Sequence, residues 1–454
     1  MASAGDVNGD GFSDIIVGAT LFDNGTTDEG AAFVYHGSAA GIVTTAATTL
    51  DNGQANSNMG ISVASAGDVN GDGYSDVIVG ANQYDNELTD EGAAFVYHGS
   101  ATGINPVAAA IREGDQLSAR FGRSVSTAGD VNGDGFADVI IGSALFNNDQ
   151  TDEGAAFIFH GSPTGIAATA ASLLEVNQAN AWFGLSVSAA GDVNGDGYAD
   201  VIVGAPLYDN NETNEGLAYV FHGSATGIVT AAATVLEVNQ ANANFGGYVS
   251  AAGDVNGDGY ADVVIGASLY DNGQTDEGVA FVYYGSVTGI NAATSSILEI
   301  NQAAAQMGTS VSGAGDINGD GYSDIVVGAP QHVNGGFLEG GAFVFQGNNP
   351  GISLRNNLRL YNTDLSTPIN SSNFFSDNFG TGLFAKSFIG RQNGKLVWET
   401  RINYDAYSGT PITNSTVFTS QQSGYSDLGA SGTELKNIIN KILASGRYTK
   451  IRAR

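Results

Sequence analysis

Residues Gly191–Gly197 read GDVNGDG, and this string decides the fold because it returns at a fixed interval. The string begins at Gly5, Gly67, Gly129, Gly191 and Gly253, and the variant GDINGDG begins at Gly315. Each start lies 62 residues after the previous one. Six copies without insertions indicate one structural unit that is duplicated and stacked, as in solenoids, propellers or arrays.

Each 62-residue unit contains four strand-like runs separated by Gly, Asn and Asp. In the fourth unit the runs are Phe183–Ser188, Asp200–Val203, Leu217–Phe221 and Val235–Val238. Before residue 430 no window sustains an apolar period near 3.6, so no helix is predicted there. Four antiparallel strands per repeat predict a propeller blade. Solenoids of parallel strands, the competing layout, usually have far shorter repeats.

The predicted fold is therefore all-β, with two domains. Residues 1–362 are predicted to form a β-propeller of four-stranded antiparallel blades, with six repeats visible and six or seven blades in the ring. Met1 aligns with Val63, so the first repeat is truncated. The sixth repeat is expected to be complete through an outer strand near Leu358–Tyr361. Residues 363–454 are predicted to form a small, sandwich-like β-rich domain that is incomplete.

The C-terminal region has a different composition and lacks the 62-residue period. Glu434–Leu443 is predicted to form a short helix, with Leu435, Ile438, Ile439 and Ile442 on one face. A degenerate seventh blade is the alternative to a separate domain, and the absence of the GDVNGDG string disfavours it. The predicted strands are Leu383–Phe388, Lys395–Arg401, Thr416–Thr419 and Tyr448–Arg454.

Charge and composition exclude several classes of function. The 454 residues carry a net charge of −32, with three basic and 41 acidic residues up to residue 352 and 12 basic and six acidic residues after it. So acidic a surface repels phosphate backbones, which argues against nucleic-acid binding and favours cations as partners. The chain has no Cys, which excludes disulfides, thiolate metal sites and cysteine catalysis. No apolar run approaches the roughly 18 residues of a transmembrane segment, and no signal peptide is recognisable.

Every repeat contains the pattern D-x-N-x-D-G-x-x-D, which predicts a calcium site. The side chains at positions 1, 3, 5 and 9 and the backbone carbonyl at position 7 supply the hard oxygens that Ca²⁺ prefers. Three carboxylates so close together repel one another without a cation. Asp and Asn as mere turn residues are the alternative, which six intact copies disfavour. The predicted ligands are Asp6, Asn8, Asp10, Phe12, Asp14, Asp68, Asn70, Asp72, Tyr74, Asp76, Asp130, Asn132, Asp134, Phe136, Asp138, Asp192, Asn194, Asp196, Tyr198, Asp200, Asp254, Asn256, Asp258, Tyr260, Asp262, Asp316, Asn318, Asp320, Tyr322 and Asp324.

About six Ca²⁺ ions, one per repeat, are therefore expected, and we expect them to be structural. An EF-hand opens with a similar pattern but needs a bidentate Glu at position 12 and flanking helices. Position 12 is Val or Ile in all six repeats and lies in the following strand. The loop is therefore predicted to connect two strands of a hairpin.

The order of motifs in residues 1–352 resembles the FG-GAP repeat of integrin α-subunit propellers and related bacterial surface proteins. In the fourth repeat the matching residues are Phe183-Gly184, the loop Asp192–Asp200 and Gly204-Ala205-Pro206. Met59-Gly60 and Met307-Gly308 replace Phe by Met. The resemblance implies a ring of usually seven blades, with calcium loops on the face opposite the ligand surface. It also implies an extracellular or cell-surface location and a role in adhesion.

Two further features recur with the same period. An acidic segment, Asp90-Glu91-Gly92 in the second repeat, should lie at the end of the blade away from the calcium loop, as a solvated loop or an acidic ring for a basic or cation-bridged partner. The sixth copy keeps only Glu339-Gly340. His36, His98, His160 and His222 lie one repeat apart and are interpreted as strand-end residues, not a metal cluster.

No catalytic motif is visible, and carboxylates that repeat in every blade differ from an active site, which normally occurs once. The sequence therefore predicts a non-enzymatic, calcium-binding propeller for extracellular recognition or adhesion of a protein or glycan ligand. A carbohydrate-binding module that accompanies an enzyme domain outside this chain is the second hypothesis. A hydrolase with its site in the central channel is the third. The sequence does not identify the ligand.

Overall fold

The computed structural model describes residues 1–318, 320, 322–336, 339–348, 358–361, 363–366, 378–385, 393–394, 396–402, 419–422, 426–427, 433–439 and 449–453. The chain divides into two compact units. The first comprises Met1–Ile352 with Phe388–Gly390, and the second comprises Ser353–Ser387 with Arg391–Arg454. The predicted boundary after residue 362 stays a prediction.

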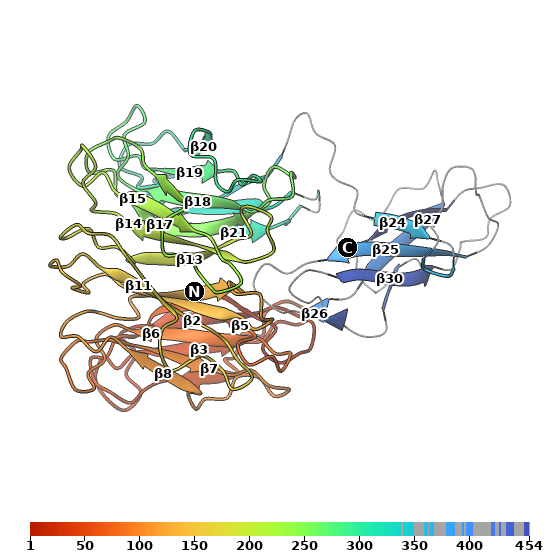
Figure 1. The fold of residues 1–454 in the computed structure, drawn as a ribbon, viewed down its shortest axis with the longest axis horizontal. Coiled ribbons are helices and arrows are strands. Elements are labelled where there is room, and N and C mark those ends of the chain that lie inside the picture. The colour runs from red at the N-terminus through yellow and green to blue at the C-terminus, as the bar shows by residue number, and fades with distance from the viewer. Residues whose placement is uncertain are drawn as a thin grey trace. The chain divides into compact units, whose positions relative to one another are not determined.

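The first unit consists of consecutive antiparallel sheets, one per repeat, whose strands follow chain order (Figure 1). The first sheet contains β1 (Ala2–Gly5), β2 (Asp14–Ala19), β3 (Ala31–Tyr35) and β4 (Thr48–Leu50). The second contains β5 (Met59–Gly67), β6 (Asp76–Ala81), β7 (Ala93–Tyr97) and β8 (Ala110–Glu113). The third contains β9 (Ser124–Gly129), β10 (Asp138–Ser143), β11 (Ala155–Phe159) and β12 (Ser172–Glu175).

The next repeats have the same topology. The fourth sheet contains β13 (Ser186–Gly191), β14 (Asp200–Ala205), β15 (Leu217–Phe221) and β16 (Thr234–Leu236). The fifth contains β17 (Phe245–Gly253), β18 (Asp262–Ala267), β19 (Val279–Tyr283) and β20 (Ser295–Leu298). The sixth contains β21 (Ser310–Gly315), β22 (Asp324–Ala329) and β23 (Gly341–Phe345). These blade-like sheets confirm the predicted all-β propeller fold.

The sixth repeat differs from the prediction. The expected outer strand forms as β24 (Leu358–Tyr361), but it pairs with β25 (Phe379–Ala385) in the second unit instead of with β23. Tyr361 is buried there and its hydroxyl reaches Glu434, so β24 gains both a ladder and a polar contact in the second unit. The expectation that this segment completes the sixth blade is wrong for the described residues.

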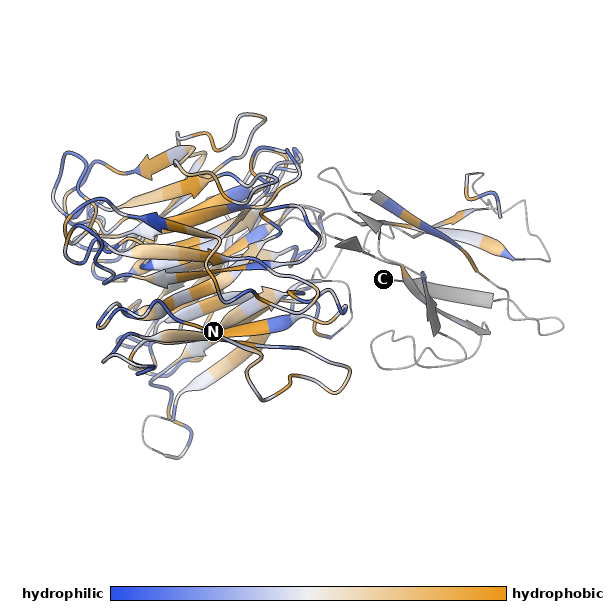
Figure 2. Cartoon of the chain, turned by 90° about the horizontal axis from the view of Figure 1, so that it is seen from below, coloured by the Kyte–Doolittle hydropathy of each residue, from blue (hydrophilic) through white to orange (hydrophobic). Residues whose placement is uncertain are grey.

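The core of the first unit lies between neighbouring sheets, which pack through their first strands in the order β1, β5, β9, β13, β17 and β21. Apolar residues follow the strands, whereas the connecting loops are largely hydrophilic (Figure 2). Val282 of β19, which packs against residues of the sixth sheet, is only 2% exposed. Its counterpart one repeat later, Val344 of β23, is 52% exposed. Burial therefore depends on the sheet that follows, because each blade supplies half of an interface.

Glycine is required where the FG and GAP motifs meet across this interface. A Cβ on Gly142 of β10 would lie 2.0 Å from the carbonyl oxygen of Gly184, which begins the next repeat. Gly184 itself has φ +82°, a backbone conformation that L side chains rarely adopt. Phe183 beside it is fully buried in the core. The two motifs therefore mark the close approach of two backbones and the aromatic anchor next to it.

The second unit is also built from strands. Its sheets have the orders β24-β25-β30, β28-β27-β31 and β26-β29. Leu396 and Trp398 from one three-stranded sheet share a small core with Leu435 and Ile439 from the other. The remaining strands are β26 (Asn393–Gly394), β27 (Val397–Ile402), β28 (Thr419–Gln421), β29 (Ser426–Asp427), β30 (Thr433–Ile439) and β31 (Thr449–Ala453).

The predicted helix over Glu434–Leu443 is wrong in its described part, which is strand β30. Leu435 and Ile439 are buried, whereas Ile438 is 43% exposed, so the apolar residues alternate in and out along a strand. Pairing of β30 with β25 overrides the helical pattern. Residues 440–443 of the predicted helix lie outside the described residues.

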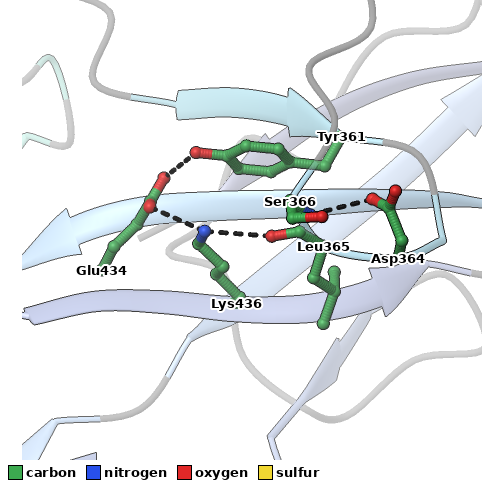
Figure 3. A network of polar contacts seen from close by, with 6 residues as sticks. All are labelled: Tyr361, Asp364, Leu365, Ser366, Glu434 and Lys436. Atoms are coloured by element: carbon green, nitrogen blue, oxygen red, sulfur yellow. Dashed lines mark hydrogen bonds and ion pairs between the residues drawn. The ribbon is translucent and has the colours of Figure 1, made fainter.

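A polar network crosses the outer face of this sheet (Figure 3). Glu434 accepts hydrogen bonds from the Tyr361 hydroxyl (2.5 Å) and pairs with the Lys436 ammonium (3.0 Å), which also donates to the Leu365 carbonyl. A Cβ on Gly382 of β25, between the two partner strands, would lie 2.7 Å from Glu434 Oε1. Glycine at this position therefore permits the network. Among the residues that the structure describes, no helix is long and apolar enough to span a membrane.

Candidate metal centre

Each D-x-N-x-D-G-x-x-D loop joins the first two strands of its sheet. In the fourth repeat the loop leaves β13 at Gly191 and enters β14 at Asp200, and these two residues pair in the antiparallel ladder. The same connection occurs in the other five repeats, which confirms the predicted hairpin and excludes flanking helices within the described residues.

Within the loop, the first three ligand positions are tied to the loop's own backbone. Both Asp192 oxygens accept amide hydrogens, from Asp196 at 3.0 Å and Gly197 at 3.0 Å. Asn194 Oδ1 accepts the Asp196 amide at 2.9 Å, and Asp196 Oδ1 accepts the Tyr198 amide at 3.0 Å. These bonds curl the chain around its side-chain oxygens, so positions 1, 3 and 5 lie within one tight turn.

The carboxylate at position 9 is completely buried in every repeat. Asp200 accepts the amides of Val193 (2.8 Å, to Oδ2) and Gly223 (2.9 Å, to Oδ1). The Gly223 amide follows β15, so this carboxylate joins the loop to the third strand of the blade. Counterparts with 0% exposure are Asp14, Asp76, Asp138, Asp262 and Asp324.

Burial gives these carboxylates unusual acid–base properties. Desolvation raises the pKa of Asp76, Asp138, Asp200 and Asp262 to about 8, although two amide donors oppose the shift. In the second repeat the charges of Asp68 and Asp72 raise the pKa of Asp76 further. The three carboxylates of one loop are therefore close enough to repel one another, and a bound cation would relieve that repulsion.

Neighbouring loops are connected to one another, which the sequence did not reveal. The carbonyl of Asp192 at position 1 accepts the amide of Ala261 in the next loop at 3.1 Å. The ring of Tyr260 at position 7 lies against Gly195 at position 4 of the preceding loop, where a Cβ would approach it to 2.7 Å. The aromatic residue whose carbonyl was the predicted ligand thus uses its side chain to contact the neighbouring blade.

The donor set suits calcium, because all the predicted groups are hard oxygens and three per loop are carboxylates. The structure brings positions 1, 3, 5 and 9 into one loop, while the position-9 carboxylate also serves two backbone amides. Among the described residues, no three Asp, Glu, His or Cys side chains already stand in an arrangement that holds a metal ion.

The second acidic segment lies at the other end of the blade, because it joins the second and third strands. In the first five repeats its glutamate is buried, contrary to the expectation of a solvated loop or an acidic ring, whereas Glu339 in the sixth repeat is exposed. The exposed fractions are 1% for Glu29, 2% for Glu91 and 0% for Glu153, Glu215 and Glu277. The glutamate points inward because the preceding residue, such as Asp276, adopts φ +49° and turns the chain there.

The histidines follow their strands directly, as predicted. His98 comes after β7 and packs against Gly165 of the next repeat, and His36 packs against Gly103 in the same way. Burial lowers the pKa of His98, and the charges of Asp72 and Asp68 oppose that shift. These residues therefore fill the interface between blades near the acidic loops.

The fold and the loops define a class of protein, the β-propeller whose blades each carry an acidic loop between their first two strands. The FG-GAP repeat family matches residues 2–35, 59–97, 121–159, 183–221, 246–283 and 307–341. The chain therefore belongs to the FG-GAP repeat proteins, and the resemblance seen in the sequence is confirmed.

Integrin alpha subunits are among its relatives. Integrin alpha-7 of Rattus norvegicus is 33% identical over 158 residues, which cover 35% of this chain and 13% of the integrin. Integrin alpha-6 of Gallus gallus is 35% identical over 161 residues, which cover 35% of this chain and 14% of the integrin. The matched stretch thus spans about one seventh of these relatives.

Similar solved structures include the exotype rhamnogalacturonan lyase YesX, with a TM-score of 0.33 and 14% identity over 80% of this chain and 72% of the lyase. Sqt1 of Saccharomyces cerevisiae has a TM-score of 0.35 and 12% identity over 78% of this chain and 77% of Sqt1. Scores of this size support no inference about function.

Proposed function

We propose that each D-x-N-x-D-G-x-x-D loop binds one Ca²⁺ ion, about six per chain, through the side chains at positions 1, 3, 5 and 9 and the carbonyl at position 7. The observation that carries the proposal is the fully buried position-9 carboxylate beside two further carboxylates of the same loop. A divalent cation compensates this concentration of negative charge, which the basic residues of the first unit are too few to do.

The calcium ions have a structural role in this proposal. Each loop is bonded to the loop of the next blade through a position-1 carbonyl, so a cation that orders one loop also supports its neighbour. Binding to the folded state alone stabilises it by mass action. The proposal includes no catalytic step, because the same carboxylates recur in every blade.

The calcium-loaded propeller is proposed to serve as an extracellular recognition or adhesion module. Support comes from the six FG-GAP repeats and from the integrin alpha relatives. Millimolar calcium outside cells matches the dissociation constants of about 10⁻⁴–10⁻³ M that are typical of extracellular modules.

Calorimetric titration of chelator-stripped protein with CaCl₂, accompanied by thermal melting, tests the metal. We expect the melting temperature to rise by about 5 °C or more in saturating calcium. The variant Asp196→Asn exchanges one exposed carboxylate ligand for a neutral amide oxygen, which should weaken that site and lower by one the number of ions bound at a calcium concentration that saturates the other loops. Glu212→Gln removes an equal charge from an exposed position outside these loops and should leave that number unchanged. An unchanged ion count in Asp196→Asn would refute the assignment.

A binding experiment tests the partner. The calcium-loaded chain is applied to a panel of purified extracellular-matrix proteins and to a glycan array, each with and without chelator. Saturable, calcium-dependent capture by a protein supports the adhesion module. Saturable binding to glycans alone would instead support the carbohydrate-binding module.

A further inference from the structure

The loop between the second and third strands contains a buried glutamate that, in the fourth and fifth repeats, accepts no hydrogen bond of ordinary geometry. Both carboxylate oxygens of Glu277 are buried without a donor, and those of Glu215 are approached only by the Asn210 backbone amide, which by itself lowers the pKa of Glu215; both residues are 0% exposed. One carboxylate oxygen of Glu29 and one of Glu153 are also buried without a hydrogen-bond donor. A buried, unpaired carboxylate costs several kcal/mol, so its recurrence in successive repeats requires a physical reason.

A second carboxylate approaches each buried glutamate from the end of the outer strand. In the second repeat Asn86 contacts both carboxylates. Its backbone amide donates to Glu91 (2.7 Å), and its side-chain Nδ2 donates to Glu113 (3.0 Å). In the fourth and fifth repeats the corresponding side chains, Asn210 and Asn272, donate to Glu237 and Glu299. Burial and the nearby charges of Glu237, Glu212 and Asp209 raise the pKa of Glu215. Two carboxylates thus share one small site.

Residues 1–352 contain too few basic side chains to neutralise these pairs. Residues 124–352 contain neither Lys nor Arg. Of the earlier arginines, Arg112 donates to the carbonyls of Ala167 and Ile166, and Arg120 pairs with Asp90 in the second repeat. In the fourth and fifth repeats no Lys or Arg of the same repeats can neutralise the carboxylates, and a cation bound from solution would compensate their charge.

We propose that Glu215 with Glu237, and Glu277 with Glu299, each bind a hard divalent cation, Ca²⁺, at the end of the blade opposite the D-x-N-x-D-G-x-x-D loops. These sites use different residues from the loops of the proposed function and stand or fall separately from them. The side chains of Asn210 and Asn272, which contact Glu237 and Glu299, carry a further amide oxygen of the kind that hard cations prefer. The same pairing recurs as Glu29 with Asp51, Glu91 with Glu113 and Glu153 with Glu175.

Calorimetric titration of the full chain with CaCl₂ tests this second set. The double variant Glu215→Gln/Glu277→Gln should bind two fewer ions than the unmodified chain and should lose part of the calcium-induced rise in melting temperature. Glu212→Gln is the matched control, because it removes the same charge from an exposed position of the same loop and should bind as many ions as the unmodified chain. Asp196→Asn reports separately on the first set of loops. A folded double variant with an unchanged ion count would overturn the proposal.

A second measurement needs no variant. Crystals of the unmodified chain soaked in Tb³⁺, which substitutes for Ca²⁺ and scatters anomalously, show directly where cations bind. We expect anomalous peaks beside Glu215 and Glu277, independently of any peaks at the D-x-N-x-D-G-x-x-D loops. Peaks only at the D-x-N-x-D-G-x-x-D loops would mean that the buried glutamates are protonated instead of bound to a cation. That result would overturn the proposal.

Discussion

The two ends of one strand, β14, treat a buried carboxylate in opposite ways. Asp200 begins the strand and Glu215 lies in the loop that follows it, and both are 0% exposed. Asp200 accepts two backbone amides, whereas Glu215 accepts no hydrogen bond of ordinary geometry and only the Asn210 backbone amide approaches it. The comparison teaches that burial alone does not define the role of an acidic residue. Asp200 stabilises the blade even when no ligand is bound, whereas the oxygens of Glu215 remain available to a ligand.

Replacing Asp200 should produce the largest effect. Asp200→Ala leaves the Val193 and Gly223 amides buried without an acceptor, so we expect the free energy of unfolding to fall by about 3–5 kcal/mol. Urea denaturation in the presence of chelator measures this change without any contribution from calcium. Glu215→Gln removes a buried negative charge that no basic residue of its repeat neutralises, so it should leave the same quantity unchanged or raise it. Equal losses in the two variants would show that the two ends are equivalent after all.

Replacing a glycine of the second strand of a blade should produce an intermediate effect. In β10 of the preceding repeat, Gly142→Ala places a methyl group about where the Gly184 carbonyl lies, so the third and fourth sheets must separate. Overpacking of this kind costs about 1–3 kcal/mol. Because both loops of the blade depend on that sheet contact, calcium affinity should fall at both ends. Chelator-free and chelator-treated melting curves measure the loss, and an unchanged midpoint would contradict the role assigned to the FG-GAP contact.

The dependence of stability on pH tests the position-9 carboxylates of several repeats together. Asp76, Asp138, Asp200 and Asp262 have pKa values of about 8 in the fold, against 3.8 ordinarily. Between these values the folded state binds more protons than the unfolded state, so stability falls as pH rises. In chelator, the melting temperature should be about 5 °C or more higher at pH 5 than at pH 8. Saturating calcium should reduce the difference, and a melting temperature that rises with pH in chelator would contradict the prediction.

Repetition explains why the first unit was predictable throughout, whereas in the second unit strands β27 and β31 were predicted and strand β30 was not. Leu217–Phe221 was predicted as a strand with the observed bounds, because the same pattern occurs at the same position of each repeat. Glu434–Leu443 occurs once, and Leu435, Ile438 and Ile439 fit both a helical stripe and a strand. Only the ladder with β25 selects the strand. Local sequence is ambiguous where one short apolar run has no second copy to compare.

The buried glutamates were within reach of the sequence but were interpreted wrongly. The segment Asp-Glu-Gly looks like a solvated turn, yet Glu and Gly persist at Glu215-Gly216, where Asn replaces Asp, and at Glu339-Gly340. The absence of Lys and Arg from residues 124–352 was a second signal, because it leaves the charge without a Lys or Arg partner in the fourth and fifth repeats. Neither signal shows that the carboxylate points inward, because that depends on the left-handed turn before it.

The sequence by itself determined the repeat of 62 residues, the all-β blades, the family and the acidic loops between the first two strands. These properties follow from local patterns, because strand alternation and turn residues act over a few positions along the chain. Only the tertiary structure decided which carboxylates are buried, which of them receive amide hydrogens, and how Asp192 of one loop bonds to Ala261 of the next. Such contacts join residues about one repeat apart, and their geometry depends on how closely two backbones approach across a sheet interface.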